Sequence, residues 1–359
     1  MEPSLNDDLG YPVVVGEDLR SELATFARKR GRPTILLCDA NRHVRVFAND
    51  VAAAVGGSPV LSFALGETRK RLSTVERVLD AMLRGGVERS SIVLGVGGGI
   101  ASDLFGFACA TYMRGVPYVH VATSLVAMVD AAIGGKTGVD LRGGKNLAGC
   151  FRDPLGVFCD VRALRTLPKR AVAEGLAEIV KAAIIEGGDF FAALEELAPH
   201  PFARWPWISV IEWAIKVKTM TVADDRVETG PRELLNLGHT FAHAIERASN
   251  YSMTHGAAVA VGLRAAGLLA LRTGRFSKAE HLRVLTLLTL LGLPLQTSVE
   301  PEVIFAAMSS DKKKRSGRMR FVLPRRIGDV EYGIECAGQS VRAVLSRLQE
   351  PPEKFRARR

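Results

Sequence analysis

The chain has 359 residues, of which 47% are hydrophobic and 24% charged, a composition typical of a globular protein with one or two domains. It contains no apolar run of the roughly 18 to 20 residues that would cross a bilayer, and acidic residues precede the first apolar run, which argues against a secretory signal. Five cysteines without a C-x-x-C pair indicate free thiols in a reducing compartment, so we expect a cytoplasmic protein with no membrane partner.

A formal net charge of +10 raises the question of a nucleic-acid partner. The basic residues are spread along the chain and concentrate only at "DKKKRSGRMR" and in the tail "EKFRARR". Neither an aromatic and basic RNA-binding pattern nor a zinc-finger spacing is present, so no nucleic-acid partner is expected. A diffuse positive field serves equally to attract a small anionic substrate.

The first half of the chain alternates short apolar runs with helical patterns. Residues 33–40, 91–99, 118–124 and 156–161 are compact β-type runs, and residues 73–87 have helical spacing with a glycine stop. Strands that alternate with helices predict an α/β fold with a parallel, Rossmann-like sheet.

From about residue 167 the apolar residues repeat at helical spacing, beginning with "AVAEGLAEIVKAAII", whereas "RMRFVLPRRIGDVEYGIEC" alternates like a hairpin. We therefore predict an α/β domain over 1–166 and a mostly α-helical domain over 167–350. A charged tail over 351–359 is expected to be disordered.

The stretch "VLGVGGGIASDLFGF" leads from a strand pattern into a helical one through Gly97, Gly98 and Gly99. Consecutive glycines let the backbone approach a ligand, and the following helix offers free N–H groups suited to a pyrophosphate. Ser102 breaks the G-x-G-x-x-G spacing. Taken alone, the stretch fits a tight strand-to-helix turn equally well.

A second glycine-rich stretch, "MVDAAIGGKTGVDLRGGKNLAG", twice places a lysine after two glycines, at Lys136 and Lys145. An ammonium group beside exposed backbone N–H groups is suited to holding phosphate or carboxylate oxygens. Asp130, Asp140 and Asn146 add further polar groups among small apolar residues. The alternative interpretation is two ordinary loops.

Three of the seven histidines fall within residues 235–256. His239 and His243 are four residues apart, on one face of a predicted helix, and His255 begins the next helical run. Glu178 is an acid within an otherwise apolar helix, one turn before Lys181, and a buried carboxylate requires a metal or a cation to compensate its charge. These residues predict a metal site, and the spacing leaves the choice of ligands open. The remaining histidines are assigned ordinary core or surface roles: His43, His120, His200 and His281.

Taken together and in order, these motifs resemble the 3-dehydroquinate synthase family, the sugar-phosphate cyclases of the shikimate pathway, which leads to chorismate and the aromatic amino acids. The resemblance covers most of the chain and rests on these motifs: "CDAN", "GETRK", "GGGIASDLFGF", "YMRG", "VDAAIGGKTGVDLRGGKNLAG", "AEIVK", "VKTMTVADDRVETGPRELLNLGHTFAHAIE", "HGAAVAVG" and "DKKKRSG".

The resemblance implies a catalytic Zn²⁺ or Co²⁺ held by Glu178, His239 and His255, with His243 near the substrate and not a ligand. It implies that the α/β domain binds NAD as a second cofactor, that the helical domain binds the metal and the substrate, and that the active site lies in the cleft between the two domains. It also implies a homodimer, in which Arg114 reaches the phosphate bound by the partner subunit. The implied catalytic residues are His243, Lys136, Asn236, Lys181 and Asp130. The implied substrate-binding residues are Arg114, Asn146, Lys218, Arg232 and Lys312. The implied NAD-binding residues are Asp39, Asn41, Glu67, Lys70, Gly98, Gly99, Asp103, Thr123, Ser124, Lys145 and Thr166.

The implied reaction is a lyase reaction on 3-deoxy-D-arabino-heptulosonate 7-phosphate: transient oxidation, phosphate elimination, reduction and intramolecular aldol closure. Alternatives are an epi-valiolone, deoxy-inosose or amino-dehydroquinate synthase, a metal-dependent polyol dehydrogenase, or a basic binding protein without catalysis. The chain departs from the family pattern at Ser102, Ala122, Asp140 and Ala257, and at the alanine pair that follows Asp130, residues 131–132, which leaves a related substrate open.

Overall fold

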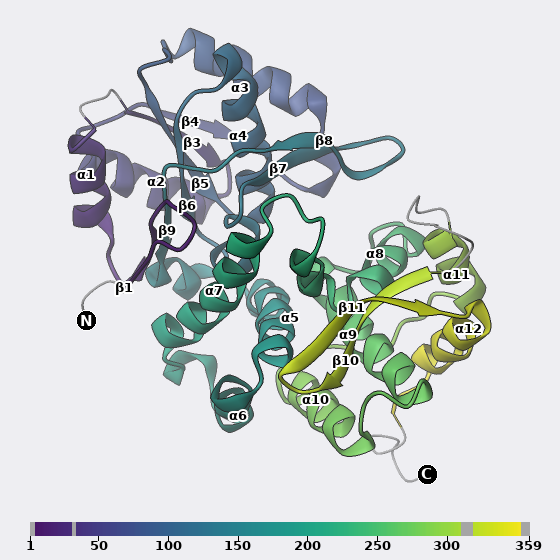
Figure 1. Cartoon of the computed structure of the whole chain (residues 1–359). Helices are drawn as coiled ribbons and strands as arrows, with labels where there is room; N and C mark the ends of the chain where they lie inside the picture. The colour runs from purple at the N-terminus through teal and green to yellow at the C-terminus, as the bar shows by residue number, and fades with distance from the viewer. Residues whose placement is uncertain (1–3, 31–33, 310–318, 353–359) are drawn as a thin grey trace. The chain divides into compact units, whose positions relative to one another are not determined.

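The structure, a computed structural model, describes residues 4–30, 34–309 and 319–352, and its chain divides into two compact units (Figure 1). The first unit comprises residues 1–172 and 206–223, and the second comprises 173–205 and 224–359. Helix α7 (Trp207–Asp224) is therefore grouped with the first unit, whereas the division at residue 166 that we predicted assigns it to the helical domain.

The first unit is built on a seven-stranded sheet in the order β1-β2-β9-β6-β5-β3-β4. All neighbouring strands pair in parallel except β1 and β2, which are antiparallel. The predicted runs correspond to β3, β5, β6 and β9, whereas β1, β2 and β4 were not predicted. The strands are β1 (Ser4–Asn6), β2 (Val13–Gly16), β3 (Thr34–Asp39), β4 (Val60–Phe63), β5 (Ile92–Gly97), β6 (Tyr118–Ala122) and β9 (Val157–Asp160).

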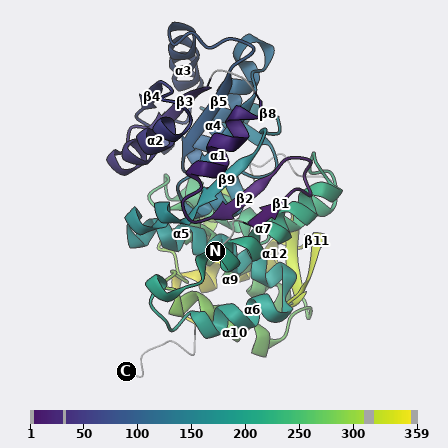
Figure 2. The same ribbon diagram turned by 90° about the vertical axis from the view of Figure 1, so that its left-hand side faces the viewer.

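Helices pack on both faces of this sheet (Figures 1 and 2). Side chains alternate along a strand, so Leu36 and Cys38 of β3 enter one core together with α1 and α2. Ile35 and Leu37 enter the opposite core with α3 and α4. Burial on both faces explains why these strands appear in the sequence as continuous apolar runs. The helices are α1 (Arg20–Arg28), α2 (Arg42–Ala54), α3 (Leu72–Arg84) and α4 (Gly99–Thr111).

The strand order reverses between β3 and β5. From β3 the chain passes through α2 to β4 on one side, and from β5 it passes through α4 to β6 on the other. In open parallel sheets, ligands bind outside the carboxyl ends of strands at such a point. Asp39 ends β3 and Gly97 ends β5, so the glycine-rich turn lies at the topological switch point.

Most of the second glycine-rich stretch forms an antiparallel hairpin of β7 (Lys136–Leu141) and β8 (Gly144–Phe151), and not a pair of loops. Gly138 lies opposite Gly149, and a Cβ atom at Gly149 would come within 2.2 Å of the Thr137 carbonyl oxygen. The glycines are therefore required by the close approach of the two strands. Short helical turns complete the first unit: η1 (Glu67–Arg69), η2 (Tyr112–Arg114), η3 (Ala127–Ala131) and η4 (Val161–Thr166).

The second unit is mostly helical, as predicted, and carries the predicted hairpin of β10 and β11, which pair antiparallel. Its core is lined by the long apolar face of α9, which also contacts α8, α10, α12 and β10. The elements are α5 (Lys169–Glu186), α6 (Gly188–Leu197), η5 (Phe202–Arg204), η6 (Pro231–Asn236), α8 (His239–Ala248), α9 (His255–Arg272), α10 (Lys278–Leu290), α11 (Pro301–Ser309), β10 (Met319–Arg326), β11 (Asp329–Cys336), α12 (Gly338–Ser346) and η7 (Arg347–Gln349). Among the described residues, no helix has both the length and the apolar character that a membrane span requires.

Candidate active site

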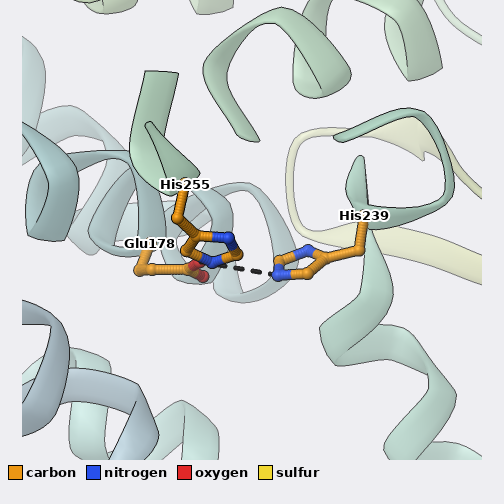
Figure 3. A group of neighbouring side chains, drawn as sticks. All are labelled: Glu178, His239 and His255. Atoms are coloured by element: carbon orange, nitrogen blue, oxygen red, sulfur yellow. Dashed lines mark hydrogen bonds and ion pairs between the residues drawn. The ribbon is translucent and has the colours of Figure 1, made fainter. Parts of the chain in front are cut away.

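Three side chains from three different helices of the second unit meet at one point: Glu178 of α5, His239 of α8 and His255 of α9 (Figure 3). Nε2 of His255 lies 3.0 Å from Oε1 of Glu178, and Nε2 of His239 lies 3.5 Å from the same oxygen. One ligand-type atom from each residue falls within 4.8 Å of the others. This is the donor set, one carboxylate and two imidazoles, that catalytic Zn²⁺ sites use.

Glycines bring these helices close enough for the three side chains to meet. A Cβ atom at Gly256, the residue after His255, would lie 2.3 Å from the Cα of Glu174 in α5. Gly238, which precedes His239, has a φ of 78°, and its carbonyl oxygen would lie 2.3 Å from a Cβ at Gly262. The start of α9 thus contacts the backbone of α5, and the start of α8 contacts α9, without intervening side chains.

Glu178 is buried, with an exposed fraction of 2%, and its carboxylate is compensated on two sides. Nζ of Lys181 lies 2.5 Å from Oε2, opposite the imidazoles that approach Oε1. Burial by itself would raise the pKa of Glu178, but Lys181, His239 and His255 outweigh burial and hold the pKa well below its ordinary value. The carboxylate is therefore ionised and able to act as a ligand at neutral pH.

Both imidazole rings are oriented through their second nitrogen. Nδ1 of His239 lies 3.3 Å from the carbonyl oxygen of Leu237, and Nδ1 of His255 lies 3.5 Å from Oε2 of Glu246. A proton on Nδ1 leaves the lone pair of Nε2 to face the cluster, an arrangement typical of metal-binding histidines. The donor set, the burial and the ring orientation therefore fit a divalent metal ion.

Protonation of His255 opposes metal binding. Burial by itself would lower the pKa of His255, but hydrogen bonding to Glu178 and Glu246 outweighs burial and raises the pKa to about 10. Without a metal, the His255 ring is therefore in its positively charged imidazolium form at neutral pH, and it lies between the two carboxylates. A divalent ion would replace that proton.

His243 lies beside the cluster and is not one of its three members. Its ring centroid is 5.3 Å from that of His239 and 6.4 Å from that of His255. The pair of histidines four residues apart, which the spacing alone left open as ligands, is thus not the pair that converges on Glu178. Two other histidines are buried in cores, and burial lowers the pKa of His120 to about 3 and that of His281 to about 4.

The segment between α7 and α8 holds one implied substrate-binding residue, Arg232, and one implied catalytic residue, Asn236, both in the second unit. Arg232 is completely buried, and its Nη1 donates to the carbonyl oxygen of Arg226 at 2.5 Å. The Asn236 amide donates to Oε1 of Glu228 at 2.6 Å. This places a guanidinium group and a side-chain amide on one short segment immediately before His239.

In the first unit, the residues implied in NAD binding gather around the glycine-rich turn. Nζ of Lys70 donates to Asp103 in the first turns of α4 and, at 2.6 Å, to Oδ1 of Asn146 in β8. Burial raises the pKa of Asp103, and Lys70 offsets part of that rise. Nζ of Lys145 lies 2.6 Å from Oε1 of Glu67. Asn146, which the resemblance assigns to the substrate, therefore lies within the same network as the cofactor residues.

Further implied cofactor residues lie at the carboxyl ends of the neighbouring strands. The Thr123 N–H donates to the carbonyl oxygen of Gly97 at 2.9 Å, and a Cβ atom at Gly98 would lie 3.0 Å from Oγ of Ser124. Asn41 is the N-cap residue of α2, and its side chain accepts a hydrogen bond from the N–H of His43. The remaining positions are Asp39 at the end of β3, Gly99 at the start of α4, and Thr166, whose hydroxyl donates to the carbonyl of Ala163.

Asp130 and Lys218 form an ion pair of 2.5 Å within the first unit. Asp130 lies in η3, a π-helical turn, a feature often found at functional sites. Lys136 begins β7, and Arg114 is exposed at the end of η2 with a φ of 66°. Lys312 lies outside the described residues.

Two acidic residues that the sequence analysis did not select become candidates through these contacts. Glu246 contacts His255, and Glu228 contacts Asn236. Glu246 looks like an ordinary acid of an amphipathic helix, although it lies two turns after His239 on the same face. Glu228 has a left-handed φ of 60°, which only the structure reveals.

Three features define the class of this protein: the doubly wound sheet, its glycine-rich turn and the glutamate–histidine cluster. They are typical of enzymes that combine an α/β unit of the nucleotide-binding type with a helical unit that carries a candidate metal site. Models of the 3-dehydroquinate synthase N-terminal and C-terminal regions match residues 60–174 and 175–314. The chain belongs to the 3-dehydroquinate synthase family.

Two proteins named 3-dehydroquinate synthase match this chain in sequence over most of their length. A 3-dehydroquinate synthase of Opitutus terrae is 38% identical over 347 residues, which cover 92% of this chain and 94% of the relative. One of Solibacter usitatus is 42% identical over 305 residues, which cover 83% and 82%.

Two solved structures, each with a TM-score of 0.84, are similar to the fold. One is a 2-epi-5-epi-valiolone synthase from Streptomyces hygroscopicus with NAD⁺ and Zn²⁺ bound, 31% identical, covering 94% of this chain and 96% of its own. The other is a 2-deoxy-scyllo-inosose synthase complexed with carbaglucose-6-phosphate, NAD⁺ and Co²⁺, 25% identical, covering 93% and 96%.

Proposed function

We propose that this protein is a 3-dehydroquinate synthase, which converts 3-deoxy-D-arabino-heptulosonate 7-phosphate into 3-dehydroquinate and phosphate. The observation that carries the proposal is the convergence of Glu178, His239 and His255 in a chain of this family. The relatives named 3-dehydroquinate synthase are 35–42% identical to this chain, which supports that reaction over those of the two structural relatives.

The proposed cofactors are NAD and Zn²⁺ or Co²⁺. The position of the glycine-rich turn at the switch point of the sheet supports the dinucleotide, because the start of α4 offers N–H groups to a pyrophosphate. Glu178, His239 and His255 would hold the metal. When bound, the two groups supply Lewis-acid activation of a hydroxyl group and reversible hydride acceptance.

The protein's own residues would bind the anionic substrate and direct its protons. The guanidinium group of Arg232 has several N–H donors in one plane, a geometry that suits a carboxylate or phosphate. Lys136 and Lys218 add ammonium groups, and Lys218 is oriented by Asp130. His243 and Asn236 would guide the proton removed during phosphate elimination. Lys181 holds Glu178 ionised. We assign Asn146 and Lys312 to the same substrate set.

We further propose a homodimer in the cytoplasm, with Arg114 of one copy serving the substrate site of the other. Large apolar side chains are exposed on the β7–β8 hairpin and next to Arg114, which supports a protein partner for this surface. They are Met113, Leu141, Leu147 and Phe151, with exposed fractions of 40%, 42%, 63% and 51%. All five cysteines are free thiols, which supports a reducing compartment.

Phosphate release tests the proposed function. The purified protein with NAD⁺ and Zn²⁺ should release phosphate from 3-deoxy-D-arabino-heptulosonate 7-phosphate without accumulating NADH, because the hydride is returned within each turnover. The same assay on a neutral heptulose 7-phosphate and on glucose 6-phosphate distinguishes the related cyclases. Preference for a neutral sugar phosphate, or steady NADH production, would contradict the proposal.

A further inference from the structure

The segment that joins α7 to α8 presents Glu228, Arg232 and Asn236, yet little of it is regular. Only residues 231–236 form a short helical turn, and Glu228 has a φ of 60°. Non-glycine residues seldom adopt this left-handed conformation. A segment of this kind lacks a hydrogen-bonded ladder, so side chains must satisfy its backbone groups and hold it in one conformation.

Asp225 supplies those contacts. Its Oδ2 accepts hydrogen bonds from the backbone N–H groups of Gly230 at 2.7 Å and Arg232 at 3.3 Å. Its Oδ1 accepts from the N–H of Thr229 at 3.0 Å. One side chain therefore binds three backbone groups located four to seven residues further along the chain.

The carboxylate of Asp225 is buried, with an exposed fraction of 7%, and it remains charged. The N–H groups of Thr229, Gly230 and Arg232 hold its pKa below the ordinary value, against the opposing effect of burial. Hydrogen bonds to an ionised acceptor are about twice as strong as those between neutral groups. Asp225 is thus well suited to fix the backbone of this segment.

The side chains of the segment are fixed in turn by the backbone that Asp225 holds. The N–H of Arg232 binds Asp225, while its guanidinium group, completely buried, donates to the carbonyl oxygen of Arg226. The Asn236 amide donates to Glu228, whose own backbone lies inside the loop that Asp225 closes. Displacement of this loop would therefore move Glu228, Arg232 and Asn236 together.

We propose that Asp225 is a positioning residue for the anionic substrate: without touching the substrate, it fixes the segment that presents Arg232 and Asn236. The proposal rests on the proposed function, because it takes these two residues as substrate contacts. It gives a role to a residue to which the resemblance assigns none and which lies outside the metal cluster.

Two substitutions at this position test the role. Asp225→Ala removes the three hydrogen bonds to backbone N–H groups. We expect KM for the sugar phosphate to rise about 10- to 100-fold, the change in affinity that corresponds to the loss of about one hydrogen bond to a charged group. We expect kcat to fall less than KM rises. Asp225→Asn keeps one acceptor oxygen, so its KM should lie between those of the wild type and Asp225→Ala. Zn²⁺ affinity, measured by competition with a chelator, should remain that of the wild type.

Asp160→Asn is the matched control. Asp160 is also a buried carboxylate that accepts backbone N–H groups, from Leu19 and Arg162, but it lies in the first unit and is not part of the proposed site. We expect this variant to lose thermal stability while KM stays within about twofold of the wild type, as for a change remote from the site. An unchanged KM in folded Asp225→Ala would overturn the proposal, as would equal KM increases in the Asp225→Asn and Asp160→Asn variants.

Hydrogen exchange separates this proposal from the proposed function. The amides of Thr229, Gly230 and Arg232 should exchange faster in Asp225→Ala than in the wild type, while those within α8 remain protected. Absence of phosphate release by the wild-type protein would contradict the proposed function alone. Unchanged exchange at the three amides would overturn the role of Asp225, whatever reaction the protein catalyses. If Asp225→Ala does not fold, Asp225→Asn decides by the same two measurements.

Discussion

The buried carboxylate of Glu178 requires positively charged or hydrogen-bonding partners around it. A carboxylate with an exposed fraction of 2% in an apolar helix would be costly without compensating charge. Lys181 compensates one oxygen, and two imidazoles approach the other. Because the lysine alone could neutralise the carboxylate, the convergence of two histidines on the free side of Glu178 is the feature that indicates a metal.

The three-ligand assignment can be tested by substituting two histidines separately. His255→Ala removes a proposed ligand, so we expect the purified protein to lose its stoichiometric Zn²⁺. His243→Ala leaves the three ligands in place, so it should retain the metal while turnover falls about 10²- to 10⁴-fold, the range for general acid–base groups. Metal content by atomic spectroscopy and phosphate release provide the two measurements. Full metal content in His255→Ala would contradict the assignment.

We expect Glu246 to affect the Zn²⁺ affinity through its contact with His255. Because it accepts from Nδ1 of His255, it fixes the ring with Nε2 toward the cluster. We expect Glu246→Ala to weaken Zn²⁺ binding about 10- to 100-fold, the usual effect of such outer contacts. Glu246→Gln retains an acceptor and should lose less. Chelator competition measures both affinities, and wild-type affinity in Glu246→Ala would show that His255 needs no such partner.

At the scale of elements, the site depends on helices that touch through their backbones. Glu178, His239 and His255 lie on α5, α8 and α9, and Gly256 and Gly262 permit those helices to approach. A side chain at either glycine would meet backbone atoms, which cannot rotate away as the end of a side chain can. The distances between the ligands are therefore set partly by residues that bear no functional group.

Gly256→Ala tests this dependence. The added methyl group would lie 2.3 Å from the Cα of Glu174, so α9 must move away from α5 and carry His255 with it. We expect the free energy of unfolding to fall by about 1–3 kcal/mol, as for overpacked sites, together with a loss of Zn²⁺ affinity. Gly143→Ala is the control, because a Cβ there meets no atom within 4 Å and its φ is not left-handed. Equal stability and metal affinity in the two variants would contradict the prediction.

The elements also show what the sequence could and could not predict. Strands β3, β5, β6 and β9 were predictable because burial on both faces produces continuous apolar runs. The β7–β8 hairpin was not, because glycine, lysine and asparagine are depleted in strands and its pairing depends on the close contact of Gly138 with Gly149. Neither Asp225 nor Glu246 could be selected from spacing, since their partners are brought to them by the tertiary fold.

At the scale of the whole molecule, metal binding should depend on pH in a direction set by the cluster. The pKa of His255 is raised to about 10, whereas that of Glu178 is held well below its ordinary value. Between pH 6 and 9 the His255 imidazole of the metal-free protein therefore holds its proton, while the Glu178 carboxylate stays ionised. In the metal-free protein, this proton stabilises the fold below the unfolded histidine pKa of about 6.5. That contribution is lost as the pH rises towards 10.

Zn²⁺ must displace this proton. We therefore expect the Zn²⁺ affinity to rise with pH, by about tenfold per unit between pH 6 and 9, with release of about one proton per ion. Calorimetry in buffers of different ionisation enthalpy measures the proton release, and His243→Ala should behave as the wild type. An affinity that does not change across this range would contradict the protonation state that the cluster implies.

Lys70 connects the glycine-rich turn to the β7–β8 hairpin in the first unit. Its ammonium group joins Asp103, beside the glycine-rich turn, to Asn146 on the β8 strand, and its carbonyl oxygen accepts from the N–H of Asp140 on β7. A dinucleotide that engages Lys70 or Asp103 would therefore change the stability of the hairpin wherever it alters these contacts. Thermodynamic reciprocity requires that a ligand held by the hairpin change the affinity for the dinucleotide by the same factor. A dinucleotide at the glycine-rich turn and a ligand at the hairpin would thus be coupled through a single lysine.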